Sequence, residues 1–277
     1  MQQSDFSNEP VVPPHADPQQ RPTFYIAMSK PVVSRIILGV LLAMFVVQVL
    51  YGIVVYDSWT SFTDTDGRVL VTLGAKVNEK IADGEVWRLF TATLLHGSII
   101  HLFFNLYALF ALGPMLEGYL GPARFTAIYV LGGLFGSLFS YAFSPANSVG
   151  ASGAIFGIIG ATTVYFFRYR NNFGAHGRAV LQNMIVVIVI NLLFGLSASN
   201  IDNWGHIGGL LGGAFVALGL LPRYQPPAVV RYGPQPLEET DRRSFEVVWI
   251  IACTVLFVVG VLLANQLYRQ QLMNLPL

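Results

Sequence analysis

Residues 125–167 read FTAIYVLGGLFGSLFSYAFSPANSVGASGAIFGIIGATTVYFF and contain no charged side chain. A membrane-spanning helix needs about 20 consecutive apolar residues, so this stretch is long enough for two such helices. The segment SPANS at residues 144–148 supplies a break between them, because proline and asparagine favour a turn. This stretch therefore predicts a pair of membrane helices joined by a short polar loop.

The composition of the whole chain agrees with a membrane protein. Hydrophobic residues make up 54% of the 277 residues and charged residues only 11%, whereas a soluble domain carries about 25% charged residues. So few charges cannot cover a water-facing surface, and we expect the lipid bilayer to surround most of the chain. The net charge of +1 gives no basic surface for nucleic acid, so no nucleic-acid partner is expected.

Five further apolar runs bring the predicted number of spans to seven. They cover residues 36–56, 89–116, 179–201, 203–221 and 247–268. The predicted fold is an all-α, polytopic membrane helix bundle, with a six-helix core and one additional C-terminal helix. A polar corner around Asn200–Asn203 separates the fifth and sixth spans.

The segments outside the spans define the expected domain limits. Residues 1–30 are rich in proline, glutamine and acidic groups, which predicts a disordered tail. The six-helix core then covers residues 31–222, and a proline-rich, charged linker covers residues 223–244. Residues 245–277 hold the seventh helix and the C-terminus.

The lysine and arginine residues in the loops predict the orientation. Eleven of the 16 fall on the side of the N-terminus and five on the other side. Since cytoplasmic loops carry the excess of positive charge, we expect a cytoplasmic N-terminus and linker and an external C-terminus. No signal peptide or organelle signal is visible, which favours a bacterial cytoplasmic membrane.

Polar side chains gather in three of the predicted spans. The second contains His96, His101 and Asn105, the fourth begins near Ser152, and the sixth begins near His206. All three spans enter from the external side, and at 1.5 Å per residue these groups lie roughly 5–20 Å below that surface. Because polar groups inside a membrane are unfavourable, their convergence at one depth indicates a functional site.

A serine and a histidine at one depth can carry out nucleophilic chemistry. The imidazole of His206 would accept the proton of the Ser152 hydroxyl if the two helices touch. Small residues four apart allow such an approach; they are Gly153 and Gly157 on one helix and Gly205, Gly209 and Gly213 on the other. His101 and Asn105, also four apart, share a helix face and would donate hydrogen bonds to an oxyanion, together with the backbone N–H of Ser152.

Four motifs in the chain resemble those of the rhomboid family of intramembrane serine proteases, over about residues 73–214. The motifs are GEVWR at 84–88, HGSIIHLFFN at 96–105, GASG at 150–153 and GHIGG at 205–209. They match that family's first-loop Trp-Arg signature, its H-x4-H-x3-N pattern, its G-x-S-G motif and its A-H-x-G-G motif, with Gly205 in place of alanine. The order and the placement at helix starts make the resemblance specific.

The resemblance implies a role for each matching residue. Ser152 would be the nucleophile and His206 the general base, with no third acidic residue and no metal or other cofactor. His101 and Asn105 would belong to the oxyanion site, with His96 and Gly150 in supporting roles. Phe156 stands where an aromatic residue, often tyrosine, packs on the catalytic imidazole. The implied substrates are single-span membrane proteins with helix-weakening residues near the external end of the span.

Several alternatives remain open at this stage. Asp202, four residues before His206, could orient the imidazole as the acid of a triad does. Trp87 and Arg88 are better explained as interfacial anchors than as groups that contact substrate.

Other functions also remain possible. A catalytically inactive relative would bind membrane clients, and a transporter would use the histidines as a proton relay. A zinc protease would coordinate its metal through His96, His101 and His206. The oligomeric state is not predicted.

Overall fold

The computed structural model describes residues 22–197 and 201–273. Within this part of the chain, seven helices have 17 residues or more. They are α1 (Val33–Tyr56), α5 (Ile99–Leu120), α6 (Pro122–Phe143), α7 (Ser152–Arg168), α8 (Arg170–Ser197), α9 (Asn203–Leu220) and α10 (Arg243–Met273). Five short helices lie between α1 and α5: η2 (Trp59–Phe62), α2 (Gly67–Leu73), α3 (Asn78–Ala82), α4 (Arg88–Thr91) and η3 (Ala92–Leu94). The predicted all-α bundle is confirmed.

The long helices have the length and composition of membrane spans. Helices α1, α5, α6, α8 and α10 are each long and apolar enough to cross a bilayer, and α7 is a shorter apolar helix. Helix α6 lies at the centre of the bundle. Of its most apolar stretch, 61% is buried inside the protein, whereas the corresponding share is 17% for α8 and for α10. The exposed side chains of the outer helices are mainly valine, leucine, isoleucine and phenylalanine, which suits a surface in contact with lipid.

Helices α6, α7 and α9 form the core of the bundle, and glycines bring their backbones together. A Cβ atom added to Gly209 would lie 2.0 Å from the carbonyl oxygen of Gly153, and one added to Gly213 would lie 2.3 Å from the Cα of Gly157. The predicted contact between the glycine pairs of α7 and α9 is thus confirmed. Gly205 differs, since the nearest atoms to its added Cβ belong to Asp202.

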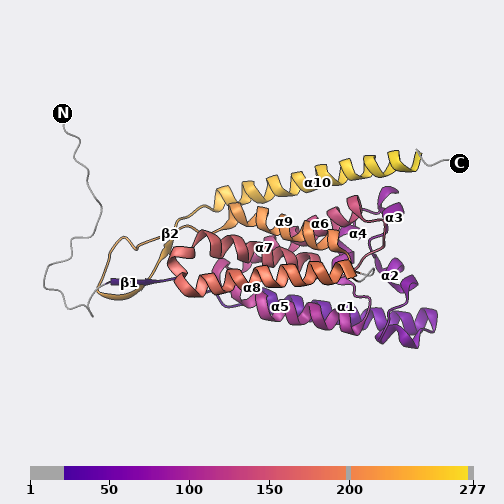
Figure 1. Cartoon of the computed structure of the whole chain (residues 1–277), viewed down its shortest axis with the longest axis horizontal. Coiled ribbons are helices and arrows are strands. Elements are labelled where there is room, and N and C mark those ends of the chain that lie inside the picture. Colours follow the sequence, from indigo (N-terminus) through magenta and orange to yellow (C-terminus); the bar gives the residue numbers. More distant parts are fainter. Residues whose placement is uncertain (1–21, 198–200, 274–277) are drawn as a thin grey trace. The chain divides into compact units, whose positions relative to one another are not determined.

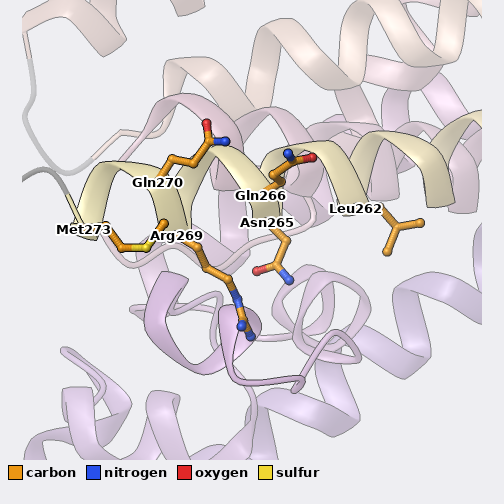
Figure 2. Close-up of a pocket in the computed structure, with 6 residues that line it drawn as sticks. All are labelled: Leu262, Asn265, Gln266, Arg269, Gln270 and Met273. Atoms are coloured by element: carbon orange, nitrogen blue, oxygen red, sulfur yellow. The ribbon is translucent and has the colours of Figure 1, made fainter.

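Helix α10 runs beside α6 and α9 (Figure 1) and carries polar contacts near both ends. Near its start, Glu246 forms an ion pair of 2.8 Å with Arg124 at the beginning of α6. Near its end, Asn265 accepts a hydrogen bond of 3.0 Å from the hydroxyl of Tyr141, and Arg269 donates to the carbonyl of Ala82. Figure 2 shows the side chains of Asn265 and Arg269 on one side of this helix and those of Gln266 and Gln270 on the other; all four line one pocket.

A separate small unit combines residues 22–27 with residues 222–241. In it, β1 (Pro22–Tyr25) pairs in parallel with β3 (Gly233–Pro236), and β2 (Tyr224–Gln225) pairs antiparallel with β4 (Glu238–Glu239). The predicted disordered tail is therefore wrong for β1, and the predicted linker contains short strands. The reason is that the partner of β1 lies about 200 residues away, so no local pattern reveals it. Residues 1–21 of the predicted tail lie outside the described residues.

Helix α5 begins later, and helix α8 earlier, than the predicted spans. Helix α5 begins only at Ile99, because Ser98 caps it by accepting a hydrogen bond from the His101 N–H, so His96 precedes the helix and is not inside the span. Helix α8 begins at Arg170 and contains a kink at Gly174, whose φ of 51° and ψ of −123° are not helical. In the polar corner, Asp202 caps α9, while Asn200 lies outside the described residues.

Candidate active site at the ends of α7 and α9

Ser152 is the first residue of α7 and follows the loop of residues 144–151. The loop enters the helix through Gly150, whose φ of +131° is rarely adopted by residues with a side chain. A Cβ atom on Gly150 would also lie 2.8 Å from both Cε1 and Nε2 of His101. Only glycine therefore allows the imidazole of His101 to approach the loop that carries Ser152.

His206 lies in the first turn of α9 and points at Ser152. The distance between His206 Nε2 and Ser152 Oγ is 3.0 Å, which is within hydrogen-bond reach for a serine and a general base. The ring of Phe156, one turn after Ser152, stacks on the imidazole with centroids 4.3 Å apart and planes 7° apart. The structure thus brings together the three residues that the motifs assigned to nucleophile, base and packing aromatic.

Asp202 contacts the helix that carries His206, not the imidazole itself. Its carboxylate accepts a hydrogen bond of 3.0 Å from the backbone N–H of Gly205 and caps α9. The Nδ1 atom of His206 is buried and has no hydrogen-bond partner among residues 22–197 and 201–273. In this arrangement the imidazole is held by stacking and by its helix rather than by an acid.

Helix α5 supplies the two predicted oxyanion residues. Asn105 is buried, and its amide nitrogen donates 3.0 Å to the carbonyl of His101 one turn earlier. The His101 ring lies against Gly150, as described above, and its edge faces the ring of His96 at a centroid distance of 5.2 Å. Of the pair, His101 is the residue that the structure brings against the serine-bearing loop.

His96 is completely buried and is fixed by α1. Gln48 of α1 donates 2.7 Å to the His96 carbonyl and accepts 3.0 Å from the His96 N–H, so one side chain satisfies both backbone groups. This places the His96 ring beside His101, which fits the supporting position that the motif implied. Gln48 was not predicted as part of the site, although a glutamine inside an apolar run is a detectable signal.

Arg88 holds the long segment between α1 and α5 together. It is only 4% exposed, and its guanidinium donates to the carbonyls of Val71 at 2.7 Å and Ala75 at 3.2 Å. It also pairs with Glu85 at 2.6 Å, and this hydrogen-bonded pair lowers the pKa of the Glu85 carboxyl. Arg88 is therefore not the exposed anchor that was predicted, because its cation bonds carbonyls inside the protein. Trp87, stacked against that cation, is half-exposed as an interfacial residue would be.

A small cavity of about 30 Å³ adjoins Ser152. Small and polar residues line it, among them Gly133, Gly136, Ser140, Ser148, Gly150 and Asp202. A space of this size beside the hydroxyl admits a water molecule or a small side chain.

Comparison with known proteins gives the family of the chain. A family model described as "Rhomboid domain" matches residues 83–223, about half of the chain. The chain belongs to the rhomboid family.

Three relatives show how much of a rhomboid protein is matched. "Rhomboid protease GluP" of Bacillus subtilis (strain 168) is 49% identical over 160 residues, which is 57% of this chain and 31% of the relative. "RHOMBOID-like protein 5" of Arabidopsis thaliana is 37% identical over 171 residues, 56% of this chain and 53% of the relative. "Rhomboid-like protease 1" of Toxoplasma gondii is 35% identical over 160 residues, 54% of this chain and 52% of the relative. The match thus spans about a third to a half of these relatives.

The rhomboid domain contains every residue that the motifs singled out, from Trp87 to His206. Two further charged residues, each bonded to backbone groups, were missed. Glu117 of α5 accepts hydrogen bonds from three backbone N–H groups at the start of α1, and Lys76 bonds the loop before Ser152. Glu117 was detectable as an acid directly after the apolar run of residues 89–116, whereas Lys76 has no sequence signal that separates it from exposed loop lysines.

Proposed function

We propose that the chain is an intramembrane serine endopeptidase that cleaves transmembrane segments of other membrane proteins. The observation that carries this proposal is the 3.0 Å separation of Ser152 Oγ and His206 Nε2 on two helices of an apolar bundle. Membership of the rhomboid family, with relatives named as proteases, supports the same reaction class. Single-span membrane proteins are the proposed substrates.

In the proposed mechanism, His206 accepts the proton of Ser152 as the oxygen attacks the carbonyl carbon of the scissile peptide bond. The negative charge that develops on the carbonyl oxygen is met by the Ser152 backbone N–H, His101 and Asn105. Collapse of the tetrahedral intermediate breaks the C–N bond, and the protonated His206 donates its proton to the leaving amine. A water molecule, deprotonated by His206, then hydrolyses the acyl-enzyme and restores the serine.

The arrangement supports a dyad in which packing orients the base. In a triad, a carboxylate bonds Nδ1 of the histidine and fixes its orientation. Here the flat stack of Phe156 on His206 restrains the ring, while Asp202 fixes the first turn of α9 through the Gly205 N–H. The Phe156 ring thus restrains one face of the imidazole, and the capped first turn of α9 fixes the backbone of His206.

The proposed substrate must present an extended peptide to this site. Helical carbonyls are already hydrogen-bonded, so a segment with helix-weakening residues reaches the serine most easily. The cavity of about 30 Å³ beside Ser152 favours a small side chain next to the scissile bond. If the N-terminus is cytoplasmic, as the loop charges predict, the site opens toward the external face of the membrane.

The proposal is tested by cleavage of a model single-span substrate in proteoliposomes. Ser152→Ala and His206→Ala should each abolish cleavage. Ser197→Ala and His176→Ala, which change exposed residues of α8, should retain it. Cleavage that persists in Ser152→Ala would overturn the mechanism. A chelator should leave the rate unchanged, and inhibition by it would favour a zinc protease.

A further inference from the structure

Lys76 lies in the segment between α1 and α5, and its side chain is completely buried. Its ammonium group donates to two carbonyls of the loop between α6 and α7, that of Ser144 at 2.9 Å and that of Ala146 at 2.7 Å. Its backbone adds two more bonds to the same loop, because Lys76 N donates 3.0 Å to the Ser148 carbonyl and Ser148 N donates 3.2 Å to the Lys76 carbonyl. One residue thus makes four hydrogen bonds to one loop.

The loop that Lys76 bonds is the one that delivers Ser152. It leaves α6 at Ser144, the residue that caps this helix, and reaches Ser152 after seven further residues. Its other backbone hydrogen bond to the same long segment runs from Gly150 N to the Ala92 carbonyl at 2.9 Å. The Ala146 carbonyl accepts from Lys76, whereas the Ser144 carbonyl accepts both from Lys76 and, at 3.1 Å, from the side-chain amide of Asn78.

If this buried position only had to be filled, an ammonium group would be an unfavourable group to place there. Burying a charge is destabilising unless hydrogen bonds and an opposite charge offset it. Burial lowers the pKa of Lys76 to about 8, and the negative charge of Asp202 opposes this shift. A methionine of similar shape would avoid the desolvation, but it would remove the ammonium donor from both loop carbonyls and leave that of Ser144 to Asn78.

Asp202 connects the same lysine to the other half of the dyad. It is the charged group whose field acts on Lys76, and it caps the helix that carries His206. The ammonium therefore bonds the loop of the serine directly and interacts electrostatically with the cap of the histidine's helix.

We propose that Lys76 is a positioning residue for the reaction: its ammonium fixes the loop of residues 144–151 and so holds Ser152 Oγ within reach of His206. This inference rests on the proposed function, since it concerns the reactivity of the proposed nucleophile. The effect acts through Ser152, and Lys76 itself contacts loop carbonyls and not the reacting atoms.

The test compares Lys76→Met with Lys80→Met in the full chain in proteoliposomes. Lys80 belongs to the same segment, but its side chain is 41% exposed and pairs with Glu85 at 3.7 Å, so it is a matched control. Lys76→Met should lower kcat about 10- to 100-fold, the effect of a displacement of about 1 Å at the reacting atoms, with KM unchanged. The rate at which a fluorophosphonate labels Ser152 should fall by the same factor, and Lys80→Met should match the wild type.

The readout separates positioning from stability. Cleavage rates are divided by the amount of Ser152 that the fluorophosphonate has labelled when the labelling reaction is complete. This amount counts only folded molecules. If Lys76 acts only on stability, fewer serines label while kcat per labelled serine stays at the wild-type value, and the proposal is overturned.

If Lys76→Met does not fold, Lys76→Gln replaces it. Its amide can donate to one loop carbonyl, so kcat should fall below the wild-type value, by less than the factor of about 10 to 100 expected for complete loss of the ammonium. A wild-type kcat in Lys76→Gln would also overturn the proposal. A wild-type protein that neither cleaves nor labels would instead reject the proposed function.

Discussion

Gly209→Ala is the substitution that most sharply tests how the dyad is assembled. Gly209 lies on α9 three residues after His206, and it faces Gly153, the residue after Ser152 on α7. An alanine Cβ at this position would lie 2.0 Å from the Gly153 carbonyl oxygen and 2.7 Å from its carbonyl carbon. The obstructing atoms are backbone, so no side-chain rotation can relieve the clash.

The size of the effect follows from these distances. Ordinary van der Waals contact begins at 3.4 Å, so α7 and α9 must separate locally by about 1.4 Å. The hydrogen bond between Ser152 and His206 is 3.0 Å long, and such a bond is lost by about 3.6 Å. A displacement of this size at the reacting atoms lowers kcat by about 100-fold or more, and the overpacking lowers the free energy of unfolding by about 1–3 kcal/mol.

The assay is cleavage of a model single-span substrate by reconstituted protein, with thermal unfolding in detergent measured in parallel. Gly39→Ala is the matched control, because a Cβ atom on Gly39 of α1 would have no atom within 4 Å. That control should cleave at the wild-type rate and unfold at the same temperature or a slightly higher one. Wild-type cleavage by Gly209→Ala would refute the claim that glycine contacts set the distance between serine and histidine.

Three further outcomes are expected. Glu117→Ala should lower the free energy of unfolding by about 3 kcal/mol in mixed micelles, because three backbone N–H groups at the start of α1 lose their acceptor; unchanged stability would contradict this. Between pH 8 and 10.5 the unfolded chain holds a proton on Lys76 that the folded protein has lost. As the pH increases through this range, the free energy of unfolding of the wild type should therefore rise by up to about 3 kcal/mol relative to that of Lys76→Met. Parallel plots of this free energy against pH for the two proteins would contradict the prediction. Gly150→Ala should slow cleavage and lower stability by about 1–3 kcal/mol because of its positive φ and the His101 ring, and a wild-type rate would show that the loop adapts.

Sequence patterns were sufficient for the membrane helices and for the pair Ser152 and His206, which the structure places 3.0 Å apart. The uncharged run of residues 125–167 gave α6 and α7 with the break in the expected place, because lipid leaves few alternatives to an apolar helix. The G-x-S-G and G-H-x-G-G motifs identified Ser152 and His206, since polar groups in such runs are rare. The contact of α7 with α9 followed from glycines four residues apart.

Contacts between distant segments were beyond the sequence. The pairing of β1 with β3 joins segments about 200 residues apart, and nothing in either proline-rich stretch marks the other. Arg88 and Lys76 are charged residues in a loop that would suit a surface, yet tertiary folding buries both and turns their cations toward carbonyls. The start of α5 at Ile99 was missed because Ser98 caps the helix inside an otherwise continuous apolar run.

The central claim is that the hydroxyl of Ser152 is activated by the imidazole of His206. The most direct measurement is reaction of the 277-residue chain with a fluorophosphonate probe, followed by peptide mass spectrometry to locate the modified residue. We expect the Ser152 oxygen to carry the phosphonyl group after loss of fluoride, and labelling to fail in His206→Ala while it persists in His176→Ala. Labelling at another residue, or equal labelling of Ser152 without His206, would contradict the account.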